Sequence, residues 1–163
     1  MFATIVNVDI DRATDQRVGA AAEASADLFD DLSFLLARAN ALSLASGNAA
    51  LSAHGLRVRS YSVLALTSGE RRPSQRELAE LLRLDPSQVV ALVDDLQRRG
   101  LVTREPDPTD RRANVVVATA EGIELYARAA ESVGAAQNEL FEGLSAADSD
   151  QLAALLRRIG FPA

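Results

Sequence analysis

The sequence contains neither cysteine nor lysine among its 163 residues, and all 17 of its basic residues are arginine. The lack of cysteine excludes disulfide bonds, thiolate nucleophiles and cysteine-ligated zinc. The lack of lysine excludes the phosphate-binding lysine of a P-loop and Schiff-base chemistry. Only His54 is a histidine, so a catalytic triad or a multi-histidine metal cluster would depend on one imidazole. We therefore expect no enzyme, no metal site and no cofactor.

Aromatic residues and long apolar runs are also scarce. Aromatic residues make up 4% of the chain, which gives no stacking platform for single-stranded nucleic acid. No stretch reaches the roughly 18 consecutive apolar residues of a membrane span. The apolar run at residues 2–8 has no basic residues before it, so we expect no signal peptide and a cytoplasmic location. Glycine and proline number 9 and 5, which favours a folded, mainly helical chain.

The net charge of −6 argues at first against a nucleic-acid partner. The charges are unevenly divided, however. Residues 57–112 hold 11 arginines and 9 acidic residues, whereas the rest of the chain holds 6 arginines and 14 acidic residues. Net charge therefore does not exclude a nucleic acid that meets residues 57–112. Repulsion from the acidic remainder predicts modest, strongly salt-dependent binding.

Segments with helical periodicity lie toward both ends of the chain. Apolar residues recur every three or four positions over residues 27–45, and Gly47 and Asn48 are expected to end that helix. A second periodic segment covers residues 57–67. Thr119 is expected to cap a helix over residues 120–142, and Ser145 with Asp148 caps a last one. These apolar stripes exceed what a small core can cover, which indicates a homodimer.

Two capping signals mark a helix-turn-helix between these ends. Ser74 with Glu77 forms a capping box before a short apolar helix. Asp85, followed by Pro86 and by Gln88 at the third helical position, begins a second helix that should end at Gly100. Two short helices joined by so short a turn are typical of a helix-turn-helix.

Two short β-type segments follow, at residues 101–104 and 114–118. The polar loop between them, residues 105–112, contains two prolines that we expect to continue neither strand. The predicted fold is mainly α with a small β-hairpin wing: a winged helix-turn-helix with N- and C-terminal dimerisation helices. We divide the chain into an arm (1–26) open to either disorder or dimer contacts, a dimerisation helix with connector (27–56), the winged helix-turn-helix (57–118) and C-terminal dimerisation helices (119–163).

Several strings resemble the MarR family of bacterial transcriptional regulators: residues 74–82, residues 85–102, the run Asp107 to Arg112, and Thr119 with Gly122. The resemblance spans roughly residues 27–161. It implies a triangular homodimer on pseudo-palindromic double-stranded DNA, with two winged-helix lobes and an effector pocket between them. It also implies a repressor released by a small anionic or phenolic effector. Because cysteine is absent, a ligand is the expected trigger rather than an oxidant.

Candidate DNA-contacting residues follow from this arrangement: Ser74, Gln75 and Arg76 for phosphates, Ser87, Gln88 and Val90 for bases, and Arg111 and Arg112 for the minor groove. Each has a competing structural interpretation. Ser74 and Gln88 are also caps, and Arg111 and Arg112 also fit a solvated turn in which Asp110 holds Arg112.

Candidate effector-binding residues lie near the junction of the two regions: His54, Arg59 and Tyr61. An arginine there suits a ligand carboxylate, but Arg57 and Arg59 equally suit DNA phosphates or solvent. Asp94 and Asp95 are expected to pair with Arg98, Arg99 or Arg76, because unpaired carboxylates would repel phosphates.

A second function stays open. Pro86 and Ala91 stand where the family often carries arginine. A winged-helix dimer that has lost DNA binding, and acts as a ligand-binding or protein-interaction module, is the alternative to a DNA-binding regulator.

Overall fold

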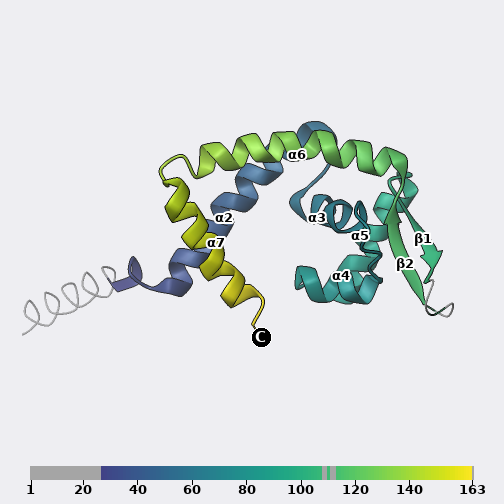
Figure 1. Cartoon of the computed structure of the whole chain (residues 1–163), viewed down its shortest axis with the longest axis horizontal. Helices are drawn as coiled ribbons and strands as arrows, with labels where there is room; N and C mark the ends of the chain where they lie inside the picture. Colours follow the sequence, from purple (N-terminus) through teal and green to yellow (C-terminus); the bar gives the residue numbers. More distant parts are fainter. Residues whose placement is uncertain (1–26, 108–109, 111–112, 163) are drawn as a thin grey trace, which may run out of the picture. The chain divides into compact units, whose positions relative to one another are not determined.

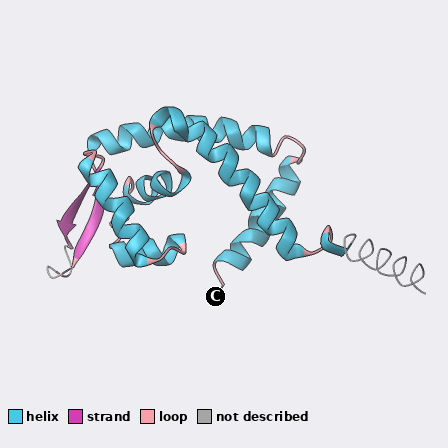
Figure 2. Ribbon diagram, turned by 180° about the vertical axis from the view of Figure 1, so that it is seen from behind, coloured by secondary structure: helices cyan, strands magenta, loops and turns pink. Residues whose placement is uncertain are grey.

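The computed structural model describes residues 27–107, 110 and 113–162. Its elements are α2 (Leu32–Leu51), η1 (Ser52–His54), α3 (Val58–Thr67), α4 (Gln75–Leu82), α5 (Pro86–Arg98), β1 (Val102–Pro106), β2 (Asn114–Ala118), α6 (Ala120–Leu140) and α7 (Ala146–Gly160). Figure 1 shows their path along the chain, and Figure 2 shows the hairpin as the one sheet of the described residues. Residues 43–162 fall in one compact unit, and residues 27–42 belong to another.

Helix α2 departs from the sequence prediction at both ends. It begins at Leu32 rather than near residue 27, with the carboxylate of Asp31 accepting a hydrogen bond from Phe34 N at 2.7 Å. It also continues through Gly47 and Asn48, so the prediction that these two residues end the helix is wrong. Their role is to dock α3: Asn48 Oδ1 accepts from Val58 N at 3.0 Å, and a Cβ on Gly47 would lie 2.9 Å from Val58 Cγ2.

The helix-turn-helix is confirmed with both predicted capping boxes. Ser74 Oγ accepts from Glu77 N at 3.2 Å at the start of α4, and Asp85 Oδ1 accepts from Ser87 N at 2.8 Å at the start of α5. Gly100 follows α5 in the left-handed conformation that suits a helix end. The helices share one apolar core with the hairpin, formed chiefly by Val63, Leu64, Leu78, Val89, Val93, Leu96, Val102 and Val116.

The hairpin extends further than the sequence indicated. Strands β1 and β2 pair antiparallel from Val102 opposite Ala118 to Pro106 opposite Asn114. The expectation that residues 105 and 106 lie in the loop is therefore wrong. Both strands of a two-stranded hairpin are edge strands, and a proline is tolerated at the end of an edge strand.

Helix α6 starts directly after β2 and is fixed to the helix-turn-helix by Thr119 and Gly122. Thr119 Oγ1 accepts from Gly122 N at 3.1 Å and donates to the carbonyl of Gly100 at 2.7 Å. Gly122 packs so closely on the backbone of Leu101 that a side chain there would collide with its carbonyl group. The predicted winged helix-turn-helix followed by helices is therefore confirmed. No helix in the described part of the chain is long and apolar enough to cross a membrane.

Candidate nucleic-acid interface and ligand pocket

Helix α5 presents one exposed face between two flanks. Its buried side consists of Val89, Val93 and Leu96, and the centre of its exposed side is formed by Ser87, Ala91, Asp94 and Arg98. One flank borders β1, in a hollow lined by Asp94, Gln97, Arg98 and Arg104. The other flank borders the start of α3. A polar, exposed helix face of this kind has the dimensions that enter a DNA major groove.

The predicted base-contacting residues lie at the first turn and a half of α5. Ser87 Oγ donates to Asp85 Oδ1 at 2.5 Å, and Gln88 Oε1 accepts from Asp85 N at 3.3 Å. The bonds from Ser87 lower the pKa of the Asp85 carboxyl. Both polar side chains therefore serve the cap in this structure, whereas Val90 is 42% exposed and contributes an apolar surface. To contact bases, Ser87 and Gln88 would have to replace these capping hydrogen bonds with hydrogen bonds to DNA.

The predicted phosphate-contacting residues start α4. Ser74 Oγ donates to Glu77 Oε2 at 2.9 Å, and Ser74 N donates to the same oxygen, which lowers the pKa of Glu77. Arg76 pairs with Glu80 at 3.0 Å, but its side chain stays 89% exposed. Because exposed ion pairs contribute little, Arg76 is available to a phosphate at small cost.

Gln75 is the one residue of this group that the structure places in a different interaction. Its Oε1 accepts from Arg104 Nε at 2.7 Å. The same guanidinium donates to Gln97 Oε1 and to Asp94 Oδ1. Arg104 therefore joins β1 to both α4 and α5, a role that the sequence analysis did not predict. The signal available in the sequence was only an arginine in the first strand of the wing.

Both acidic residues of α5, Asp94 and Asp95, form ion pairs, but only Asp95 does so with a predicted partner. Asp95 pairs with Arg98 at 2.9 Å and lies 3.6 Å from Arg99, as predicted. Asp94 pairs with Arg104 instead of the predicted arginines. The prediction for Asp94 failed because its partner comes from a strand that only the folded hairpin brings near. Arg111 and Arg112 lie outside the described residues.

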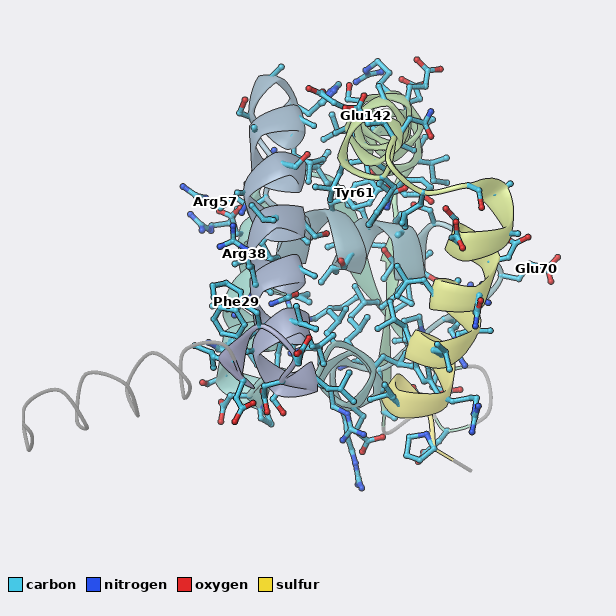
Figure 3. All side chains as sticks on the ribbon, turned by 90° about the vertical axis from the view of Figure 1, so that its left-hand side faces the viewer. Phe29, Arg38, Arg57, Tyr61, Glu70 and Glu142 are labelled. Carbon is cyan, nitrogen blue, oxygen red and sulfur yellow. The ribbon has the colours of Figure 1, made fainter. Side chains whose placement is uncertain are left out.

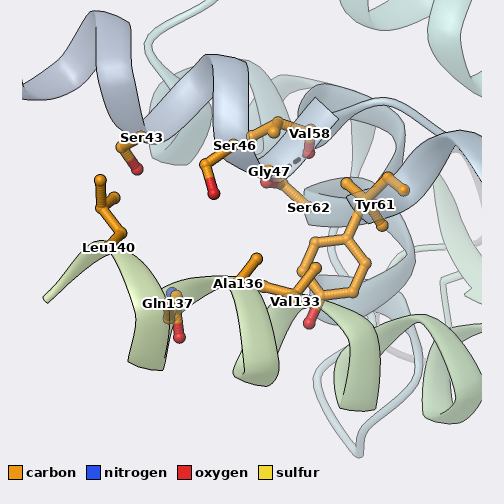
Figure 4. Close-up of a pocket in the computed structure, with 11 residues that line it drawn as sticks. Ser43, Ser46, Gly47, Val58, Tyr61, Ser62, Val133, Ala136, Gln137 and Leu140 are labelled. Carbon is orange, nitrogen blue, oxygen red and sulfur yellow. Dashed lines mark hydrogen bonds between the residues drawn. The ribbon is translucent and has the colours of Figure 1, made fainter. Parts of the chain in front are cut away.

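A cavity of about 210 Å³ opens between the C-terminal half of α2, the start of α3 and the second half of α6 (Figure 4). Its lining is Ser43, Ser46, Gly47, Leu51, Val58, Tyr61, Ser62, Val133, Ala136, Gln137 and Leu140. These side chains are apolar or neutral hydrogen-bonding groups, and none carries a charge. The cavity is therefore suited to an uncharged group smaller than a typical drug-sized ligand.

Tyr61 is the aromatic residue of this cavity and lies beside α6 (Figure 3). Its ring packs against Tyr126 of α6 with centroids 5.4 Å apart and planes tilted by 33°. Burial, followed by the neighbouring Tyr126, raises the pKa of Tyr61 above its ordinary value. Tyr61 therefore stays protonated at neutral pH and offers a neutral hydroxyl close to the cavity.

The other two predicted effector residues lie elsewhere. His54 Nε2 is 2.9 Å from Ser132 Oγ, a contact that joins η1 to α6, and His54 does not line the cavity. Arg59 lies in a separate groove along α5. The cavity residues of α2 and α6 were not predicted, because their spacing resembles that of an ordinary helix interface. Among the described residues, no group of three or more metal-ligating side chains comes together.

Comparison with known proteins identifies the family. Residues 54–113 match the family model described as MarR family. A transcriptional regulator of the MarR family from Rhodococcus sp. RHA1 is 44% identical, with 82% of this chain and 96% of that chain covered and a TM-score of 0.77. The chain therefore belongs to the MarR family of transcriptional regulators.

Two further relatives were solved with a bound molecule, and a third is named for an operon. CouR from Rhodococcus jostii RHA1, solved with p-coumaroyl-CoA, is 42% identical, with 83% of this chain and 96% of that chain covered and a TM-score of 0.76. A repressor CouR on a 23-mer DNA duplex is 29% identical, with 82% and 94% covered and a TM-score of 0.75. A regulatory protein assigned to the hcr operon of Thauera aromatica is 31% identical over 61% of this chain, and the match spans 60% of that protein, less than two thirds of its length.

Proposed function

We propose that this regulator is a homodimeric repressor that binds pseudo-palindromic double-stranded DNA and is released by a small effector with a phenolic group. The observation that carries the DNA-binding part is the exposed face of α5, which lies beside a hairpin wing and has its buried side fixed in the lobe core. A relative of the same fold is bound to a DNA duplex. In this arrangement α5 enters a major groove, the wing lies along the neighbouring backbone, and half-sites lie about 10 base pairs apart.

Within that arrangement the predicted contacts divide into two kinds. Ser87, Gln88 and Val90 face bases, whereas Ser74, Gln75 and Arg76 at the start of α4 face phosphates, together with Arg111 and Arg112 in the wing. Because α5 lacks a bidentate arginine at Pro86 and Ala91, we expect its base specificity to be modest.

The effector proposal rests on the cavity between α2, α3 and α6. Its neutral lining accepts a phenolic ring but offers no cation to a buried carboxylate. A relative 42% identical binds p-coumaroyl-CoA, whose acyl group is a phenol and whose charges lie on the CoA portion. We therefore place the phenolic group in the cavity and the anionic portion outside it. His54, which does not line the cavity, remains a candidate for contacts with that outer portion. Arg59 is a candidate for the same contacts only if the groove that it borders does not bind DNA.

The dimer proposal rests on α7. This helix of 15 residues has no buried residue, although Leu152, Leu155, Leu156 and Ile159 form one apolar stripe. A helix of this length is marginal in water unless its apolar face is covered. A second copy of the chain, packing its own terminal helices against this stripe, covers it, in line with the division of the chain into a DNA-binding segment at 57–118 and dimerisation segments around it.

Fluorescence anisotropy with the DNA upstream of the protein's own gene tests the function. We expect saturable binding by a dimer that weakens steeply between about 50 and 200 mM salt, and release of the DNA by p-coumaroyl-CoA or a related thioester. A DNA complex that never forms at about 50 mM salt, together with a ligand-induced rise in melting temperature, would support the ligand-binding module instead.

A further inference from the structure

A second hollow of the DNA-binding lobe is strongly basic. It is a groove lined by Gly55, Arg57, Arg59 and Ser60 on one side and by Gln88, Ala91, Leu92, Asp95 and Arg99 of α5 on the other. We call it the α3/α5 groove. Three guanidinium groups border it, against the single carboxylate of Asp95, which also binds Arg98.

Two of these arginines are uncommitted. Among the described residues of this groove, Arg99 takes part in an ion pair, whereas no ion pair includes Arg57 or Arg59. The other described arginines without an ion pair, Arg38, Arg71, Arg83, Arg157 and Arg158, do not line this groove. Both side chains are exposed, and Figure 3 shows Arg57 projecting away from the ribbon. The backbone of Arg57 is held instead, because its N–H donates to Ser60 Oγ at 3.0 Å. The main chain at Arg57 is therefore held in place, while the guanidinium groups of Arg57 and Arg59 have no ion-pair partner.

Arg99 closes the end of the groove. Its guanidinium lies over Gly55, where a Cβ would be 3.5 Å from Arg99 Nη2, and Gly55 has the left-handed φ of 61°. The Asp95 carboxylate, 3.6 Å from Arg99, partly neutralises this arginine but reaches neither Arg57 nor Arg59 in an ion pair. The net positive charge is therefore concentrated at the α3 side of the groove.

The position of the groove on α5 suggests its occupant. Gln88 and Ala91 border it. Ala91 belongs to the exposed face that the proposed function places in a DNA major groove, and Gln88 lies next to that face. The hairpin lies on the opposite flank, beside Asp94 and Arg104. A helix in a major groove has a phosphate backbone along each side. In this arrangement the wing lies beside one DNA backbone, and the α3/α5 groove faces the other.

We infer that the α3/α5 groove holds a segment of the DNA phosphate backbone on the side of α5 opposite the wing, with Arg57 and Arg59 binding its phosphates. This inference rests on the proposed DNA-binding function and assigns Arg57 and Arg59 to it. Such interactions fix the register of α5 in the major groove and carry no base preference. Arg57 and Arg59 also provide positive charge at this groove, although the chain as a whole is acidic.

The test is DNA binding by the full-length double variant Arg57→Ala/Arg59→Ala, titrated from about 50 to 300 mM salt. We expect binding to weaken about tenfold or more at about 100 mM salt, equally for operator and unrelated duplexes. The slope of log K against log salt should fall by about 0.9 for each phosphate that the variant no longer neutralises. The variant Arg57→Lys/Arg59→Lys should keep most of the affinity, since lysine still binds phosphate as a point charge.

A matched control removes the same charge elsewhere. Arg128→Ala/Arg157→Ala takes two exposed arginines from α6 and α7 and should alter the salt slope much less than the groove variant. Neutral methylphosphonate linkages, introduced one at a time, locate the phosphates that the groove binds. A linkage beside the groove should weaken DNA binding by the wild type and leave binding by the Arg57→Ala/Arg59→Ala variant unaffected.

Three results would overturn the inference. If wild type binds DNA and the groove variant binds it with the same affinity and the same salt dependence, the groove does not bind the DNA backbone, and the proposed function stands. If the groove variant keeps its DNA affinity but no longer responds to p-coumaroyl-CoA, the groove serves the effector. If wild type itself fails to bind DNA at about 50 mM salt, the inference and the proposed function fall together.

Discussion

Arg104 Nη2 donates to Asp94 Oδ1 at 2.6 Å, and this ion pair joins the first strand of the wing to the exposed face of α5. Asp94 lies near the centre of the face that we assign to DNA, where a free carboxylate would repel phosphates. Arg104, whose side chain is 26% exposed, neutralises it and at the same time holds Gln75 and Gln97. One guanidinium thus ties the wing to both helices of the helix-turn-helix.

We expect Arg104→Ala to weaken DNA binding more than the double variant Arg104→Ala/Asp94→Asn does. The single variant leaves an unpaired carboxylate on the DNA-facing side, and the second substitution removes that charge. A coupling of about 1 kcal/mol, or about fivefold in affinity, is expected from a partly exposed pair. Anisotropy titrations of the wild type, both single variants and the double variant give this coupling. Additive effects of the two substitutions would mean that the pair plays no part in DNA binding.

Gly122→Ala should destabilise the protein by about 2 kcal/mol or more, because its Cβ would collide with the Leu101 carbonyl group on the strand side of α6. Gly134→Ala is the matched control in the same helix. A Cβ at Gly134 meets nothing within 4 Å, so alanine there should stabilise α6 by up to about 1 kcal/mol through helix propensity. Urea unfolding of both variants measures the difference, and equal effects would contradict the close approach at Gly122.

Arg83→Gly should stabilise the protein. Arg83 ends α4 with a left-handed φ of 52°, a conformation that costs a residue with a Cβ about 1 kcal/mol relative to glycine. For a chain of this size that gain raises the melting temperature by roughly 2–4 °C. Arg83→Ala separates the backbone from the side chain, since it keeps the strained Cβ and should give no such rise. A similar rise in both variants would assign the effect to the guanidinium instead.

Ala136→Leu should abolish the response to p-coumaroyl-CoA while leaving DNA affinity unchanged. The added carbons fill part of the cavity of about 210 Å³ between α2, α3 and α6. Ala135→Leu, on the exposed side of the same helix, is the control and should respond like wild type. The measurement is the effector concentration that releases half of the bound DNA. An unchanged value for Ala136→Leu would place the effector elsewhere.

Acid should weaken the three helix caps that use carboxylates. Hydrogen bonds from Ser74, Ser87 and Ser145 lower the pKa values of Glu77, Asp85 and Asp148 in the folded protein. A lowered folded pKa contributes stability that is present above the unfolded pKa and is lost as pH falls through the folded pKa. The melting temperature should therefore fall as pH drops from roughly 5 to 3. The triple variant Glu77→Gln/Asp85→Asn/Asp148→Asn should show a shallower fall, and an equally steep one would assign the acid sensitivity to other groups.

Local capping chemistry explains how much of the fold could be predicted. Ser74, Asp85, Thr119 and Ser145 each begin a helix where the sequence placed one, because a cap bonds amides only two or three residues away. The role of Gly47 was predicted wrongly for the opposite reason. Whether that glycine ends a helix or admits a neighbour depends on α3, and the pattern around Gly47 contains no information about how closely Val58 approaches.

The candidate sites also divide into residues that local sequence predicted and residues that only the fold brings together. Ser87, Gln88 and Val90 were assigned to α5 from its cap and periodicity, and the structure places them at its start. The partner of Asp94, the cavity residues of α6 and the groove between Arg57 and Arg99 join segments far apart in the chain. No spacing within one element predicts such interactions.

The sequence by itself determined the order of elements, their caps, the uneven distribution of charge and the absence of cysteine and lysine chemistry, because each depends on neighbouring residues or on composition. The tertiary structure alone decided which charges remain unpaired. Arg104 is committed to Asp94 because the hairpin folds back beside α5. Arg57 and Arg59 stay uncommitted because α3 places them in a groove whose one carboxylate is held by other arginines.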